Sequence, residues 1–315
     1  SGSITLKSTG NLTVSTAQPA PTGSVTLTTD GLLTLPTATP LSARTLTATA
    51  DTAASMLLDV DKAIITLNAA GNLTIQQNTA RSLDLTASVL SGSITVSTAT
   101  ADIELTSLIL RTASNSFDAI VTSGGNLTIG QITAGLYYQN LAAVPADVTA
   151  IHSVSDVTLT AAGSITEAVT DSDVDVIADT LTLTAGTGIG LLQIAANSLD
   201  ARTTSGSITL VDVDSQKEIA GGLTVTRAAA ADAVAITASG NLIVLLATAS
   251  GGSGSVSLVS TADNIRVPRP ASGAAISASA LISLSASETI RMYTLLTSAE
   301  RVEYRGEELI RSEEH

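Results

Sequence analysis

The sequence contains no cysteine and no tryptophan, and aromatic residues of any kind make up only 2% of its 315 residues. Without cysteine the chain has no disulfide, no cysteine-based zinc or iron–sulfur site and no thiol nucleophile. Hydrophobic residues still account for 44% of the chain, so its apolar mass is Ala, Val, Ile and Leu in a background of Thr, Ser and Gly. Small and β-branched side chains of this kind favour narrow, repetitive strand layers over one bulky core.

Charged residues are also scarce, at 13% of the chain, and 14 basic against 28 acidic residues give a net charge of −14. An acidic body repels phosphate backbones and anionic lipid, so we expect no nucleic-acid partner. No segment approaches the ~18 consecutive apolar residues that a membrane span needs, and we expect no membrane insertion. The chain starts at Ser1 inside a repeat motif, without a basic signal-peptide region, as expected of an excised fragment or a processed chain.

Two short motifs recur along the chain. One is Gly-Ser-[Ile/Val]-[Thr/Ser]-x and the other is Gly-Asn-Leu-[Thr/Ile]-[Val/Ile]. Within both, apolar and polar residues alternate with the period of two that is typical of a strand. The first motif occupies residues 2–6, 23–27, 92–96, 163–167, 206–210 and 254–258, and the second occupies residues 10–14, 71–75, 125–129 and 240–244.

The motifs return at a nearly constant spacing. The spacing is 21 residues between Ile4 and Val25, Leu12 and Leu33, Val25 and Leu46, and Leu73 and Ile94; it is 19 between Leu223 and Leu242 and 22 between Val234 and Val256. One coil cannot bury its own apolar face, whereas coils stacked in parallel enclose a continuous apolar column. We therefore predict an all-β fold, a right-handed parallel β-helix (β-solenoid) with about 20 residues per coil and roughly 14 or 15 coils. An antiparallel sandwich is the main rival fold.

The pattern divides the chain into regions. Residues 1–299 are predicted to form the parallel β-solenoid, as a fragment of a larger repeat array. The period lapses between Gly130 and Ser155, around Pro145, so we expect segment 130–155 to be a lateral loop. Residues 300–315 hold nine charged residues in sixteen and are expected to form a charged C-terminal boundary segment.

The repeats Gly-Ser-Ile-Thr-Leu at residues 2–6 and Gly-Asn-Leu-Thr-Val at residues 10–14 resemble those of filamentous haemagglutinin-like exoproteins and other very large bacterial adhesins. The resemblance covers roughly residues 1–290. It implies a right-handed β-helix that is extracellular or displayed on the bacterial cell surface. It further implies a structural or adhesive module, a non-catalytic elongated spacer or binding rod, whose partner is a receptor or glycan on a host or neighbouring cell.

Right-handed β-helices also include polysaccharide lyases and hydrolases, and paired acidic residues leave a carbohydrate-active enzyme open as an alternative. Two carboxylates held about 5–10 Å apart on neighbouring coils are what glycoside hydrolysis requires. Sugar-cleaving grooves normally need aromatic platforms and basic residues to bind the substrate, and we expect neither near these groups. We therefore predict solvated faces or corners, no catalytic residues and no enzyme. The groups are Asp171, Asp173 and Asp175; Asp212 and Asp214; and Asp59 and Asp61.

Other polar residues suggest little chemistry. Asp171 to Asp175 leave a calcium-stiffened module open, but they lack the glycine and terminal glutamate of an EF-hand loop. No Ser/His/Asp arrangement can be assembled around His152, and His315 ends the chain. We therefore predict no metal site, no cofactor and no obligate small-molecule ligand.

Two further groups of residues bear on binding. Tyr137 and Tyr138 in the expected loop, with Phe117 one coil earlier, are the candidate binding residues for a receptor or glycan. These aromatics could equally cover the side of the solenoid beneath the loop. The sequons at Asn11, Asn72 and Asn126 allow N-glycosylation. In a repeat, however, we expect these asparagines at corners, where they hydrogen-bond between coils.

Overall fold

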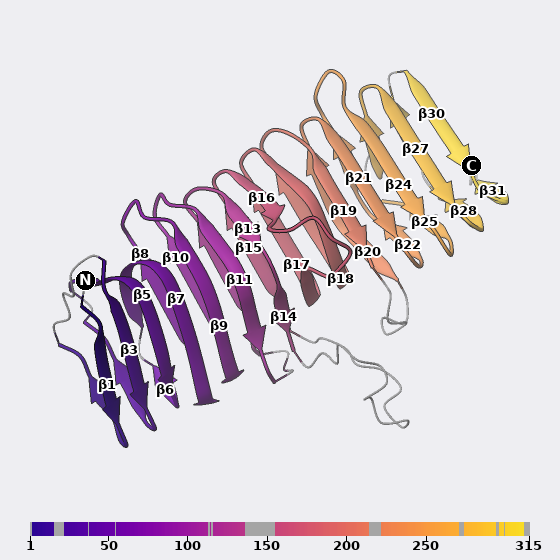
Figure 1. Ribbon diagram of the computed structural model, residues 1–315. Helices are drawn as coiled ribbons and strands as arrows, with labels where there is room; N and C mark the ends of the chain where they lie inside the picture. The colour runs from indigo at the N-terminus through magenta and orange to yellow at the C-terminus, as the bar shows by residue number, and fades with distance from the viewer. Residues whose placement is uncertain are drawn as a thin grey trace, which may run out of the picture. The chain divides into compact units, whose positions relative to one another are not determined.

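The computed structural model describes residues 2–15, 22–36, 38–53, 55–112, 114, 116–135, 155–213, 222–270, 274–293, 296–298 and 300–311. These residues form β-strands and no helix. The strands stack in parallel coils (Figure 1). Successive coils are about 21 residues apart and form a β-solenoid of about 12 turns. Within the described ranges, no helix is long and apolar enough to cross a membrane.

The chain divides into two compact units. The first contains β1–β15, and the second contains β17–β31 together with residues 164–166 of β16. The strands up to β15 are β1 (Ile4–Ser8), β2 (Leu12–Thr13), β3 (Ser24–Thr29), β4 (Leu32–Thr34), β5 (Leu41–Ala50), β6 (Thr52–Ala53), β7 (Met56–Ala70), β8 (Leu73–Gln77), β9 (Leu83–Ser91), β10 (Ile94–Thr98), β11 (Ile103–Leu110), β12 (Ala119–Ser123), β13 (Leu127–Ile129), β14 (Ile132–Ala134) and β15 (Val157–Ala161).

The remaining strands, β16 to β31, extend to Arg311, the last residue that the structure describes. They are β16 (Ser164–Glu167), β17 (Val176–Ala185), β18 (Gly188–Thr203), β19 (Ile208–Asp212), β20 (Leu223–Ala230), β21 (Ala233–Ala238), β22 (Leu242–Val244), β23 (Ala247–Ala249), β24 (Ser255–Ser260), β25 (Ile265–Val267), β26 (Ile276–Ala278), β27 (Leu281–Ala286), β28 (Thr289–Met292), β29 (Leu296–Ser298), β30 (Arg301–Arg305) and β31 (Glu308–Arg311).

The strand register confirms the spacing found in the sequence. All six pairs of apolar residues that the motif spacing relates lie opposite each other in neighbouring parallel strands: Ile4 and Val25, Leu12 and Leu33, Val25 and Leu46, Leu73 and Ile94, Leu223 and Leu242, and Val234 and Val256. The parallel β-solenoid prediction is therefore confirmed, and the antiparallel sandwich is not formed.

The number of turns is smaller than the 14 or 15 expected. Some coils contain more residues than the average: Ile94 pairs with Ala119, 25 residues further on, and Ala119 pairs with Val157, 38 residues further on. Each of these steps completes one turn with more residues than the average of about 21. The chain therefore completes about 12 turns.

The core of each unit consists of columns of inward-facing side chains. In β3, Val25 and Leu27 are each 1% exposed, while the alternate residues Thr26 and Thr28 face outward. One inward column of the first unit contains Val25, Leu46, Ala63, Leu85, Leu105 and Ile129. A column of the second unit contains Leu210, Ile236, Leu258, Leu284 and Tyr304.

Two of the expected region boundaries differ from the structure. The segment 130–155, expected as a lateral loop, contains strand β14, which pairs with β11, so stacked strands continue as far as Ala134. Residues 136–154 of that segment, including Pro145, lie outside the described residues. The segment 300–315, expected as a boundary, contains β30 and β31, which pair with β27 and β28. Stacked strands therefore extend past residue 299, to Arg311.

Candidate functional site

Of the three aromatic residues expected to bind a partner, the structure places one. Phe117 is half-buried just before β12, and its backbone N–H donates to the carbonyl oxygen of Ser114 at 3.1 Å. Tyr137 and Tyr138 lie outside the described residues, as do His152 and His315. The aromatic binding site thus stays a prediction.

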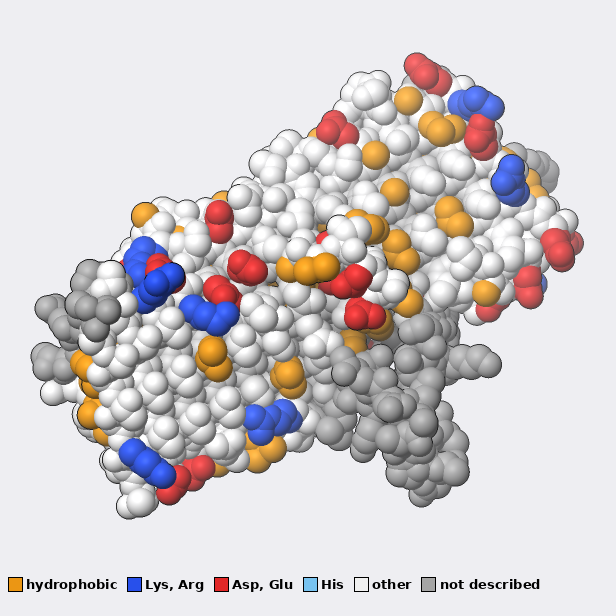
Figure 2. Space-filling model, in the orientation of Figure 1, with side chains coloured by type: hydrophobic (Ala, Val, Ile, Leu, Met, Phe, Trp, Pro, Cys, Tyr) orange, Lys and Arg blue, Asp and Glu red, His pale blue; other side chains and the backbone are white. Residues whose placement is uncertain are grey.

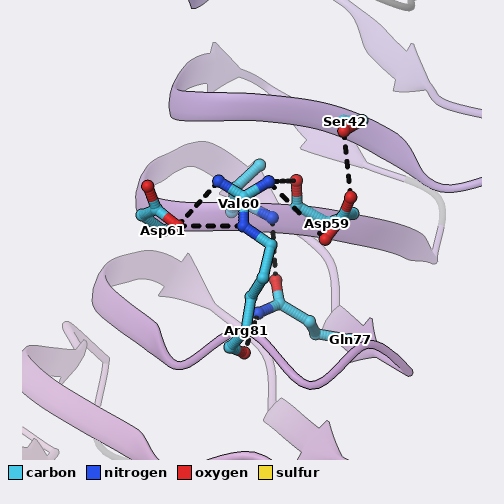
Figure 3. A network of polar contacts seen from close by, with 6 residues as sticks. All are labelled: Ser42, Asp59, Val60, Asp61, Gln77 and Arg81. Atoms are coloured by element: carbon cyan, nitrogen blue, oxygen red, sulfur yellow. Dashed lines mark hydrogen bonds and ion pairs between the residues drawn. The ribbon is translucent and has the colours of Figure 1, made fainter. Parts of the chain in front are cut away.

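Asp59 and Asp61 lie on the same outward face of β7, as the strand period requires, and both face an arginine (Figure 3). Arg81 Nε and Nη2 donate to Asp61 Oδ1 at 2.9 and 2.6 Å. Its Nη1 donates to the backbone oxygen of Asp59 at 2.9 Å and lies 3.6 Å from Asp59 Oδ1. The prediction that no basic residue lies near this pair is therefore wrong, because Arg81 comes from the next coil, 20 residues along the chain.

Two more residues extend this network to neighbouring coils (Figure 3). Gln77 is fully buried; its Oε1 accepts the Val60 N–H at 3.0 Å and its Nε2 donates to the Arg81 carbonyl at 2.6 Å. Ser42 in β5 donates to Asp59 Oδ2 at 2.9 Å. These polar side chains join successive coils. The bonds of Ser42, Arg81 and the Gln77 oxygen cross from one coil to another, and the bond from Gln77 Nε2 holds Arg81 in place.

The group Asp171, Asp173 and Asp175 does not form a strand. The segment bends, and Asp171 Oδ1 accepts the Asp173 N–H at 2.8 Å. Asp171 and Asp173 are exposed, whereas Asp175 is only 4% exposed and its Oδ2 accepts the Gln193 N–H at 2.8 Å. The expectation of a solvated position is thus wrong for Asp175, which ties the bend to β18.

Asp212 also departs from the expected solvated face. It ends β19 on the inward side, 4% exposed, and pairs with Ile194 and Ala238 in the neighbouring strands. Its expected companion Asp214 lies outside the described residues. Across the described part of the chain, no group of three or more His, Cys, Asp or Glu residues could hold a metal ion.

The side chains of Asn11 and Asn72 hydrogen-bond to the coil that follows, as predicted for all three sequons. Asn11 Oδ1 accepts the Leu32 N–H at 3.0 Å, and Asn72 Oδ1 accepts the Ser93 N–H at 2.9 Å. A Cβ on Gly31 would lie 2.7 Å from Asn11 Oδ1, which explains the glycine at this corner. At the third sequon the Asn126 backbone N–H donates to Asp102 Oδ1 at 2.6 Å, a bond to the coil that precedes it.

Charged side chains form an outward column in the first unit that the sequence motifs did not indicate. The column contains Thr45, Lys62, Asp84, Glu104 and Thr128, each in register with the next. Lys62 Nζ lies 2.6 Å from Asp84 Oδ2, and Thr106 Oγ1 donates to Asp84 Oδ1 at 2.7 Å. Figure 2 shows such blue and red side chains beside one another over β7, β9 and β11, on a face that is otherwise mostly white.

The second unit has an outward column of a different composition. It contains Ile243, Arg266, Arg291 and Ile310, again in register. Both arginines are exposed. Elsewhere in this unit Arg202 pairs with Asp200, whose hydrogen bond and charge raise the pKa of the guanidinium further above its ordinary value. The motif spacing could not have identified these columns, because the steps between their charged residues range from 20 residues to 25 and follow no single period.

Stacked parallel coils, inward apolar columns and hydrogen-bonded corners define the chain as a β-solenoid repeat protein. No protein-family model matches the chain, and no curated protein and no solved structure matches it either.

Proposed function

We propose that the chain is a structural and adhesive module of a large bacterial exoprotein of the filamentous haemagglutinin-like kind, located on the cell surface or outside the cell. In this role it is a non-catalytic spacer or binding module, and its partner is a receptor or glycan on a host or neighbouring cell. The proposal builds on the resemblance of the Gly-Ser-Ile-Thr-Leu and Gly-Asn-Leu-Thr-Val repeats to those of such adhesins.

The main support for the proposal is that polar side chains of the described residues form bonds between coils. Asp59 and Asp61, a candidate acid–base pair, are held by Arg81, and the corner residues Asn11 and Asn72 bond to the coil that follows. A hydrolase needs one carboxyl group that can donate a proton and another that stays ionised. Arg81 engages both carboxylates of the pair, at 3.6 Å from Asp59 Oδ1 and at 2.6 Å from Asp61 Oδ1. The arrangement therefore suits the joining of coils better than acid–base chemistry.

Beads coated with the chain test the proposal. Beads that carry the folded chain should attach to epithelial or bacterial cell layers more strongly than beads that carry the heat-denatured chain. The same folded chain should release no reducing ends from pectin or polygalacturonate. Equal attachment by both kinds of bead would contradict the adhesive role. Release of reducing ends that disappears in Asp173→Asn would replace the proposal with the enzyme alternative.

A further inference from the structure

Two arginines in neighbouring strands of the second unit face each other with like charge. Arg266 in β25 and Arg291 in β28 are direct register partners, so their backbones are about 4.8 Å apart. Like charges directly opposite each other in a sheet destabilise it. Both side chains are exposed, on a chain whose net charge is −14. A repulsive pair in such a setting is the kind of local conflict that is expected at a functional site.

The residues around the pair do not neutralise it. Along the column the neighbours are Ile243 and Ile310, which carry no charge. No ion pair involves Arg266 or Arg291 in the described part of the chain.

Two nearby corner carboxylates, those of Asp263 and Glu288, are engaged elsewhere. Asp263 Oδ2 accepts from Asn241 Nδ2 at 2.7 Å, and Asp263 Oδ1 accepts the Asn264 N–H at 2.9 Å. Glu288 Oε2 accepts from Asn264 Nδ2 at 3.3 Å. The third acidic neighbour, Glu308, is exposed in the adjoining column, opposite Thr289. The two guanidinium groups are thus available to an anion from outside.

An aromatic side chain borders the arginines. Met292 is buried, so the strand alternation places Tyr293 on the outward side with Arg291, and Tyr293 is 40% exposed. The Tyr293 N–H donates to the Val267 carbonyl at 3.0 Å, so the backbone pairing of the two coils continues as far as Tyr293. Tyrosine and arginine are among the side chains enriched at the centres of binding surfaces.

We propose that Arg266 and Arg291 bind the carboxylate of an acidic sugar, such as a uronic or sialic acid unit of a cell-surface glycan, with Tyr293 against the sugar ring. The inference rests on the proposed adhesive function and names the chemistry of its partner. Guanidinium groups bind carboxylates through paired hydrogen bonds, which favours an anion shared by both arginines. An isolated carboxylate fits better than a dense polyanion, because the net charge of −14 repels the latter.

Binding of short glycans to the full chain tests the site. Trigalacturonate and sialyllactose are compared with neutral lactose by NMR titration at low salt. We expect the acidic ligand to bind and lactose not to, and preference for one of the two acids identifies the source of the carboxylate. Arg266→Gln and Arg291→Gln should each weaken binding about tenfold, as expected for a lost charge-assisted hydrogen bond, and Tyr293→Ala should weaken it less.

Arg44→Gln provides the matched control, since Arg44 is an exposed arginine of the first unit opposite no second arginine. It should leave the affinity unchanged. No preference for either acid over lactose, or an equal loss in Arg44→Gln, would overturn the site. The melting temperature of each variant shows that it folds. Bead attachment that persists in Arg266→Gln would reject this site while leaving the adhesive function intact, whereas attachment that does not depend on folding rejects the function itself.

Discussion

The charged outward columns of the two units differ in how they are compensated. In the first unit the acidic neighbours Asp84 and Glu104 share their column with Lys62, which forms an ion pair with Asp84. In the second unit Arg266 and Arg291 lie between two isoleucines. A column that contains its own counter-charge contributes to the stacking of coils. A column without one leaves its charge for a ligand, which is why we place the candidate binding site in the second unit.

The inward columns, by contrast, are alike in both units. Leu85 in β9 and Leu258 in β24 are fully buried, and both lie between apolar residues of the coils on either side. The two units therefore differ in their outward charged columns and are alike in their inward apolar columns.

The largest expected losses of stability test whether the apolar cores of the two units are equivalent. Leu85→Ala and Leu258→Ala should each lower the free energy of unfolding by about 3 kcal/mol, because each removes a buried side chain and leaves a cavity between coils. Hydrogen exchange of the amides in each unit measures the loss locally. The outward substitutions Thr86→Ala and Ser257→Ala serve as controls and should cost far less. A large loss in one unit and a negligible one in the other would break the equivalence of the two cores.

An intermediate effect is expected at the network of the first unit. Arg81→Ala should cost about 2 kcal/mol, because it leaves Asp59, whose side chain is only 21% exposed, without its positive neighbour. Arg81→Lys should recover part of the loss, since it restores the charge without the paired geometry. Thermal melts of the three proteins at the same pH provide the measurement. If Arg81→Ala melts like the parent chain, the network does not hold the coils together.

The smallest expected effects have opposite signs in the two columns. Lys62→Gln should destabilise the first unit by about 0.5 kcal/mol, because Asp84 and Glu104 lose their counter-charge. Arg266→Gln should stabilise the second unit by a similar amount, about 0.5 kcal/mol, because it removes a like-charge repulsion. Both effects should shrink as salt is added, since exposed charges are screened. Hydrogen exchange at low and high salt follows each unit separately, and equal signs would contradict the comparison.

The arrangement of the apolar residues could be predicted from the sequence, because it depends on two short-range properties. Alternation along a strand decides which side chains point inward, and the return of a motif after about 21 residues decides which coils they meet. Val25 and Leu46, or Leu73 and Ile94, are therefore partners that the spacing alone identifies. The corner bonds of Asn11 and Asn72 follow from the same repeat, since each asparagine holds the same place in its motif.

The partners of the charged residues were decided only by the tertiary structure. Arg81 meets Asp61, and Arg266 meets Arg291, across coils of 20 and 25 residues, so no single period relates both pairs. Asp175 is buried because its segment bends where alternation would have continued a strand. An apolar column tolerates changes in coil length, since any inward apolar residue of the next coil can pack against the one before it. A charge interacts with one particular neighbour, and the length of each coil determines which neighbour that is.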